Sequence, residues 1–170
     1  IGAQTATAIA TIAPENNGII CTKSVMFDAT HMLTVFQDST SGNVSACISE
    51  WDPAAHTLTS NTITDLGITG GGYHVDFEQI DATHYLISYD TGTDLMAQVI
   101  EVNAGTYVVS TVGTALTTGT TSAAVQSHVV QIDADHYSIS ITKSATCGHF
   151  MIGEINLATW AVTAATALTD

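Results

Sequence analysis

The sequence predicts an all-β protein built from three four-stranded antiparallel repeats. The tetrapeptide Asp-Ala-Thr/Asp-His occurs three times, at residues 28–31, 81–84 and 133–136. The spacings are 81 − 28 = 53 and 133 − 81 = 52 residues, and a fixed period in this range is typical of repeat architectures. Apolar positions recur with a period of two around each tetrapeptide, which indicates strands, and no helical period persists.

Each repeat contains four predicted strands in the same order. The first strand ends at the tetrapeptide, the second follows directly, and a polar loop and a short turn opened by Asp or Asn separate the others. In this alignment Leu58, Tyr107 and Trp160 occupy equivalent places near the start of the fourth strand. The repeats span 19–66, 73–116 and 125–168, with strands predicted at 19–27, 32–36, 44–51 and 57–66, at 73–80, 85–89, 95–102 and 106–116, and at 125–132, 137–141, 149–155 and 159–168.

Two architectures use such repeats. Three hairpin-like connections followed by a longer link describe a blade of a β-propeller. A β-trefoil is the alternative, because it also contains three repeats of four strands. A further strand predicted at residues 1–12 resembles every fourth strand and has no place in a trefoil, so the arrangement favours propeller-like blades.

The second repeat reads "IDATHYLISYD" at 80–90 and "AQVIEVNAGTYVVSTVGTAL" at 97–116. This pattern resembles the β-propeller repeats of phage tail fibres, other virion-associated proteins and related marine bacterial surface proteins. Their repeats of about 50 residues combine a Leu-Asp turn, a Tyr-ended strand, a Val-rich strand and an outer strand rich in Thr and Gly. The resemblance covers residues 19–168 and implies a structural or adhesive role.

The charge balance limits the partners that we expect. The chain carries 16 acidic residues against Lys23 and Lys143, for a formal net charge of −14. Nucleic acids and anionic membranes need basic residues, so neither is expected as a partner. No apolar run reaches 18 residues, which argues against membrane insertion. The Thr- and Ser-rich polar surface favours an extracellular or virion-surface location.

The six Asp and His residues of the tetrapeptides are interpreted as structural turns. An Asp that opens a turn bonds the backbone two residues on, and His tolerates unusual backbone angles. A metal site is the alternative, but zinc ligands must converge on one point, and one His per blade would not. The residues are Asp28, His31, Asp81, His84, Asp133 and His136.

Two other kinds of ligand are considered. Tyr73, Trp51 and Trp160 could stack on sugar rings, although packing between strands is the simpler role for aromatic residues at alternating positions. Asp90 and Asp94 flank a Thr-Gly-Thr loop that resembles part of a calcium site, although calcium needs 6 to 8 oxygens and the other repeats lack the pattern. No cofactor is expected beyond this possible calcium ion.

No catalytic motif occurs in the chain, and Glu50, Glu101 and Glu154 recur at a repeated position that favours a structural role. The sequence therefore predicts a non-enzymatic structural or adhesion module of a virion or extracellular appendage. Its expected partners are other copies of itself, other virion or appendage proteins, and cell-surface glycans. The alternative is a carbohydrate-binding lectin with one site per blade. Three repeats are too few to close a ring, so we expect further blades upstream of Ile1 or head-to-tail copies.

Overall fold

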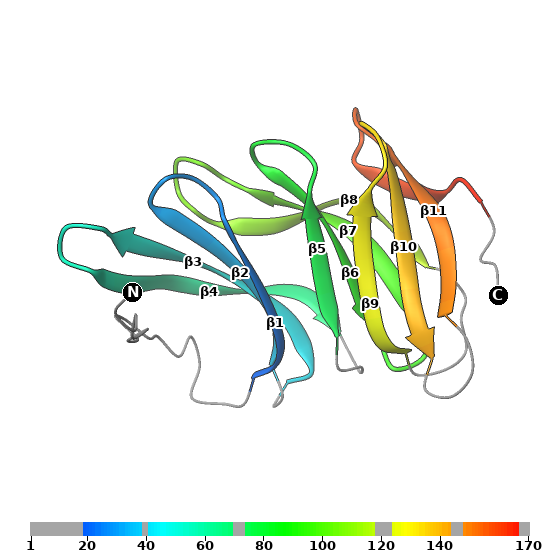
Figure 1. Cartoon of the computed structure of the whole chain (residues 1–170), viewed down its shortest axis with the longest axis horizontal. Coiled ribbons are helices and arrows are strands. Elements are labelled where there is room, and N and C mark those ends of the chain that lie inside the picture. Colours follow the sequence, from blue (N-terminus) through cyan, green and yellow to red (C-terminus); the bar gives the residue numbers. More distant parts are fainter. Residues whose placement is uncertain (1–18, 39–40, 70–73, 118–123, 144–147, 167–170) are drawn as a thin grey trace, which may run out of the picture.

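The computed structural model describes residues 19–38, 41–69, 74–117, 124–143 and 148–166, which form antiparallel strands and no helix. The strands make three four-stranded sheets, each with its strands in chain order (Figure 1). The first sheet contains β1 (Ile19–Met26), β2 (His31–Asp38), β3 (Asn43–Asp52) and β4 (Thr57–Thr69). The second contains β5 (Val75–Gln79), β6 (His84–Asp90), β7 (Leu95–Val102) and β8 (Val109–Thr117). The third contains β9 (Ala124–Gln131), β10 (His136–Lys143), β11 (Gly148–Asn156) and β12 (Ala161–Ala164).

The fourth strand of each sheet differs most from the sequence-based prediction. β4 continues to Thr69 instead of ending at 66, whereas β8 begins at Val109 and β12 is only four residues long. The late starts of β8 and β12 follow from a residue with positive φ that completes the preceding turn, Tyr107 in one case and Trp160 in the other. The strand predicted at 1–12 lies outside the described residues.

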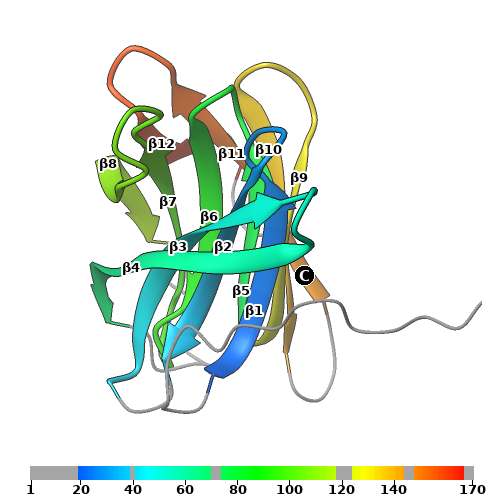
Figure 2. The same ribbon diagram turned by 90° about the vertical axis from the view of Figure 1, so that its left-hand side faces the viewer.

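The three sheets pack face to face and enclose two hydrophobic cores. The second sheet lies between the other two and contributes to both cores (Figures 1 and 2). Its alternate residues point to opposite faces, as strand geometry requires. Tyr85 and Ile87 therefore pack against the first sheet, and Leu86 packs against the third.

Equivalent strands of successive sheets lie next to each other. The first strands β1, β5 and β9 are in contact in that order, and the fourth strands β4, β8 and β12 are in contact along another edge. The connections β1–β2, β5–β6 and β9–β10, which carry the tetrapeptides, lie at one end of the molecule, the upper rim in Figure 1. This stacking brings the turns of one sheet against the turns of the next.

Candidate functional site

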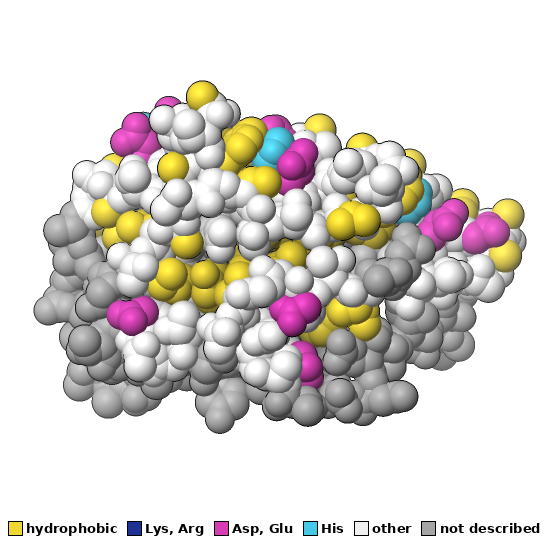
Figure 3. Space-filling view, turned by 180° about the vertical axis from the view of Figure 1, so that it is seen from behind, with side chains coloured by type: hydrophobic (Ala, Val, Ile, Leu, Met, Phe, Trp, Pro, Cys, Tyr) yellow, Lys and Arg dark blue, Asp and Glu magenta, His cyan; other side chains and the backbone are white. Residues whose placement is uncertain are grey.

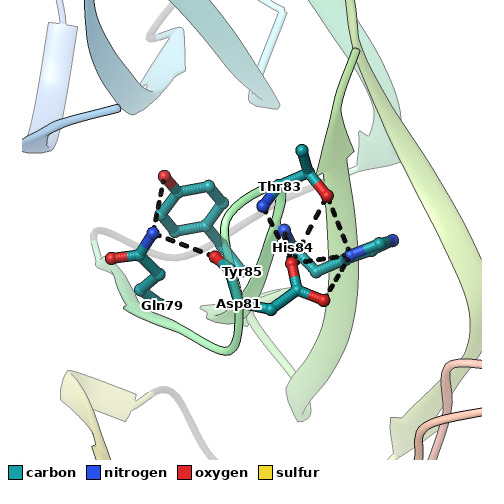
Figure 4. Close-up of polar contacts among 5 residues, drawn as sticks. All are labelled: Gln79, Asp81, Thr83, His84 and Tyr85. Atoms are coloured by element: carbon teal, nitrogen blue, oxygen red, sulfur yellow. Dashed lines mark hydrogen bonds and ion pairs between the residues drawn. The ribbon is translucent and has the colours of Figure 1, made fainter. Parts of the chain in front are cut away.

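The tetrapeptide turn is held together by the carboxylate of its Asp. In the second sheet, Asp81 Oδ1 accepts hydrogen bonds from the backbone N–H groups of Thr83 and His84, both at 2.8 Å. The ring Nδ1 of His84 lies 2.9 Å from the same oxygen, so the carboxylate also orients the imidazole (Figure 4). Because a carboxylate accepts several donors here, it closes the turn and fixes one ring nitrogen as a donor.

The same contacts recur in the other two sheets. Asp28 Oδ1 accepts from the N–H groups of Thr30 and His31, each at 2.7 Å, and Oδ2 lies 2.8 Å from His31 Nδ1. In the third sheet Asp133 Oδ1 lies 2.9 Å from both the backbone nitrogen and Nδ1 of His136. The six residues that the sequence assigned to structural turns therefore lie in three equivalent hydrogen-bonded turns.

These contacts shift the pKa of the groups involved. Desolvation acts to raise the pKa of Asp28 and of Asp81, but hydrogen bonds from the turn N–H groups and from the imidazole outweigh it, and each pKa is lowered. The hydrogen bond from His136, followed by the N–H of Asp135, lowers the pKa of Asp133 to about 2. In return, the hydrogen bond to Asp133 raises the pKa of His136 above its usual value.

The expectation that His occupies these turns because of unusual backbone angles is wrong. None of the three tetrapeptide histidines has positive φ. The non-glycine residues with positive φ in the described chain are His56, Tyr107 and Trp160, with φ of 53°, 55° and 58°. Each completes the turn between the third and fourth strands of its sheet. The equivalence drawn between Leu58 and the other two residues was therefore wrong by two positions, and His56 is the true counterpart.

This second turn has its own recurring hydrogen bonds. An Asp or Asn four residues before the positive-φ residue accepts two backbone N–H bonds through its side chain. The backbone N–H of Tyr107 and of Trp160 donates to the carbonyl of Asn103 and of Asn156, both at 2.7 Å. The turn thus forces an aromatic residue into a left-handed conformation that bulky residues seldom adopt.

The two kinds of turn meet between successive sheets. His31 of the first sheet stacks on Tyr107 of the second, with ring centroids 3.9 Å apart and an interplanar angle of 20°. His84 of the second sheet stacks on Trp160 of the third, at 3.7 Å and 18°. Each stack joins a histidine that its own Asp orients to an aromatic ring that the next sheet presents. The same contact therefore holds both sheet–sheet interfaces together.

Grooves lie beside both stacks. A groove of about 560 Å³ opens between the second and third sheets, and its lining residues are Ile80, Asp81, Gln131, Ala134, Leu157 and Trp160. A groove of about 850 Å³ opens between the first and second sheets, and its lining includes Tyr107, Asp65 and Thr64. Each groove therefore combines one aromatic ring with polar groups, an arrangement that suits a small polar ligand.

The residues proposed for sugar binding have different surroundings. Trp160 is half-buried, lines the groove between the second and third sheets, and is covered on one face by His84. Trp51 is half-buried as well, but its ring lies next to His56, with centroids 6.1 Å apart, and lines neither groove. Tyr73 lies outside the described residues. Of the two described residues, Trp160 lies where a ligand could reach it together with polar groups.

The proposed calcium ligands Asp90 and Asp94 make hydrogen bonds within their own loop. Asp90 is 2% exposed, and its Oδ1 accepts the N–H of Gly92. Asp94 Oδ2 instead accepts the hydroxyl of Thr93. Among the described residues neither belongs to a group of three carboxylate, His or Cys ligands. The bonds that they make are those of a closed hairpin loop.

Asp133, Asp135 and His136 do gather ligand atoms within 4.8 Å of one another. His136 Nδ1 lies 2.9 Å from a carboxylate oxygen of each aspartate, so the imidazole donates to carboxylates. Glu154 lies opposite His136 on the neighbouring strand, as Glu50 lies opposite His31. The recurring glutamates thus lie across the strand pair from the tetrapeptide histidines. The contacts among Asp133, Asp135 and His136 form a hydrogen-bond network within the tetrapeptide.

A second polar cluster, which sequence reasoning missed, lies on the first strands of the three sheets. Asp76 on β5 is 9% exposed and forms an ion pair of 2.7 Å with Lys23 on β1. Its Oδ2 accepts the backbone N–H of Val129 on β9 at 3.0 Å. One carboxylate therefore ties all three sheets together. No local pattern marks Asp76, because Lys23 and Val129, its partners in the other two sheets, are each more than 50 residues away along the chain.

Two histidines border this carboxylate. His128 Nδ1 lies 3.6 Å from Asp76 Oδ2. His74 is half-buried, and desolvation lowers its pKa, although the charge of Asp90 acts in the opposite direction. Both histidines line a groove of about 250 Å³ with Lys23 and Asp76. The carboxylate of Asp76 thus has three close partners: the backbone N–H groups of Phe77 and Val129 and the ammonium group of Lys23.

No protein-family model matches the chain, and no curated protein sequence matches it either. Within the part of the chain that the structure describes, no helix is long and apolar enough to span a membrane.

Proposed function

We propose that this chain is a non-enzymatic structural or adhesion module of a virion or extracellular appendage, built from β-propeller-like blades. The observation that carries the proposal is the stack that recurs between successive sheets, His31 on Tyr107 and His84 on Trp160. Because this contact recurs with the period of the sequence, each repeat packs on the next in the same way, as the units of repeat proteins do. In all three turns the Asp and His groups hold the turn itself, and in the first two sheets the His also contacts the next sheet.

The strand pairing supports blades over a β-trefoil. All the described strand pairs join strands of the same repeat, in chain order, as in a propeller blade. The first strands β1, β5 and β9 are neighbours, as the inner strands of successive blades would be. A trefoil would instead pair strands of different repeats.

The surface composition supports an extracellular or virion location. Figure 3 shows one face of the molecule, where acidic side chains are spread over the surface, histidines lie in the upper half, and no Lys or Arg is visible among the described side chains. With a formal charge of −14, the surface repels nucleic acid and anionic lipid. The partners compatible with this acidic surface are uncharged glycans and proteins that pack against the faces of its sheets.

Localisation tests the proposal. An antiserum raised against residues 1–170 should label virions or extracellular appendages in fractionated cultures of the source. The same antiserum after adsorption with the purified protein is the control and should label nothing. Labelling confined to the interior of cells would contradict the proposed function.

A carbohydrate-binding lectin is the second candidate, and the groove between the second and third sheets favours it. Trp160 there lies with Asp81 and Gln131, which combine an aromatic face with groups that hydrogen-bond sugar hydroxyls. A glycan array would show a sugar whose binding is lost in Trp160→Ala and in Gln131→Ala. Trp51→Ala, outside the groove, should keep the binding. If no glycan on the array is bound, the lectin function is excluded and the structural module is the remaining candidate.

A further inference from the structure

The two faces of each sheet have different roles in stacking. We call the face that carries the tetrapeptide histidine the histidine face, and the opposite face the receiving face. Residues two apart share a face, so His31 and Leu33 lie on the histidine face of the first sheet, which packs on the second sheet. Likewise His84 and Leu86 face the third sheet. The receiving face carries Tyr85 in the second sheet.

The histidine face of the third sheet is not covered by another described sheet. Its His136 side chain is 35% exposed, whereas those of His31 and His84 are 11% and 12% exposed. Ile132, directly before the tetrapeptide, is 55% exposed. Its counterparts Phe27 and Ile80 are half-buried and pack into the two cores. The third sheet thus exposes a histidine and an apolar residue at the two positions that are buried in both sheet–sheet interfaces.

The first sheet, at the opposite end of the stack, exposes the turn position that receives a histidine in the other two sheets. His56 occupies the left-handed turn position that Tyr107 and Trp160 occupy in the other sheets, and it is exposed. Among the described residues no tetrapeptide histidine lies on it. Met26, on β1 beside this end, is 49% exposed. The first sheet therefore offers an aromatic ring at the position where a preceding sheet would place its histidine.

We infer that a second copy of this chain docks head to tail, with His136 and Ile132 of one copy against the His56 turn of the next. The inference rests on the proposed function, because it names the partner of a module that assembles by its sheet faces. The contact is confined to the turn end of the first sheet, since Phe36 and Cys47 on the same receiving face are buried within the chain itself. A head-to-tail contact generates rings or filaments.

Electrostatics determines how the association responds to salt. Copies with a formal charge of −14 repel each other at low ionic strength, and salt screens that repulsion over distances of about 10 Å at 0.1 M. Association that depends on ring stacking and apolar contact should therefore strengthen as salt rises. An association driven by ion pairs would weaken instead.

Sedimentation velocity on the purified chain, over a range of protein and salt concentrations, tests the inference. The wild-type protein should form oligomers whose average size increases with protein concentration and with salt concentration. Ile132→Asp removes the apolar half and His56→Asp removes the ring, and Asp tolerates the left-handed conformation at position 56. Each variant alone should stay monomeric. Mixed together, they should form one-to-one dimers and nothing larger, because each retains the half that the other lacks.

Val108→Asp is the matched control. It adds the same charge at an apolar residue that is 53% exposed and lies on neither terminal face, so it should assemble like wild type. Circular dichroism and thermal melting verify that each variant is folded. A wild type that stays monomeric, or blocked variants that fail to dimerise when mixed, would overturn the inference. Antiserum labelling does not depend on self-association, so a monomer found on virions would refute the docking and keep the proposed function.

Discussion

His84 lies flat on Trp160, with the ring centroids 3.7 Å apart and the planes 18° apart. Asp81 holds the imidazole from its edge through Nδ1, at 2.9 Å. Trp160 in turn is held in a left-handed conformation by the turn that begins at Asn156. Two local turns thus position two rings so that they meet across a sheet–sheet interface. The same relationship joins His31 to Tyr107.

A double-mutant cycle measures this stack. We expect His84→Ala and Trp160→Ala to show a coupling energy of about 0.5 to 1.5 kcal/mol in urea unfolding, because aromatic pairs contribute that much beyond their buried area. The control cycle combines His31→Ala with Trp160→Ala, whose rings lie in different interfaces. Its two effects should add within about 0.5 kcal/mol. Equal coupling in both cycles would show that the stack itself contributes nothing.

Gly113 tests how closely the second and third sheets approach. A Cβ at this position would lie 2.0 Å from the carbonyl oxygen of Trp160, and its φ is +67°. We expect Gly113→Ala to lower the free energy of unfolding by about 3 kcal/mol or more, combining backbone strain with a steric clash. The measurement is chemical denaturation followed by Trp fluorescence.

Gly67→Ala separates the two contributions to that loss. Gly67 has the same φ of +67°, but nothing lies within 4 Å of its Cβ position. Its substitution should cost about 1 to 2 kcal/mol, from the left-handed conformation alone. If both variants lost the same stability, the close approach of Gly113 to Trp160 would not matter.

The Asp133–His136 pair predicts a pH dependence. The pKa of His136 is raised above the ordinary histidine value of 6.5, so this contribution to stability is present below that pH and is lost as the pH rises through the raised value. The pKa of Asp133 is lowered from 3.8 to about 2, so its contribution is present above 3.8 and lost as the pH falls toward about 2. Both contributions are therefore fully present between pH 3.8 and pH 6.5.

An NMR titration of the His136 ring measures the effect. In Asp133→Asn its pKa should fall, because the hydrogen bond to the Asp133 carboxylate is the largest cause of the increase. Asp135 and Glu154 remain and should keep part of the increase. Asp94→Asn, in a loop of the second sheet, is the control and should leave the titration unchanged. An unchanged pKa in Asp133→Asn would contradict the assigned hydrogen bond.

Asp76 should contribute more to stability than any loop carboxylate. Asp76→Ala leaves the buried N–H of Val129 without its acceptor and removes the ion pair of Lys23, which keeps its hydrogen bond to the carbonyl of Phe77. We expect a loss of about 2 to 3 kcal/mol, which is the cost of an unsatisfied buried donor together with a weak contribution from the partly exposed lysine. Asp94→Ala is the control and should cost less than about 1 kcal/mol, because the carboxylate of Asp94 accepts the hydroxyl of Thr93 in a surface loop and joins no sheets. Equal losses would show that Asp76 does not join the sheets.

The strands and turns could be predicted because their signals are local. The period of two predicted β7 at 95–102, the bounds that the structure shows. The Asp of each tetrapeptide predicted a turn, because an Asp side chain bonds its own backbone within three residues. The left-handed position was misaligned in the first repeat, where counting four residues from the turn-opening Asp52 gives His56 and not Leu58. Backbone dihedrals identify it directly.

The repeat, the strand order and the two recurring turns can be derived from the sequence alone, because each depends on residues that are neighbours along the chain. The packing of the sheets is needed to show that His31 and His84 stack on rings of the following sheet. It is also needed to show that Asp76 binds groups from both other sheets. These contacts need the faces of separate sheets to be packed together, and a side chain on a strand does not reveal in the sequence which distant face it will meet. The exposure of His136 and His56 at opposite ends likewise follows from the stacking of the sheets.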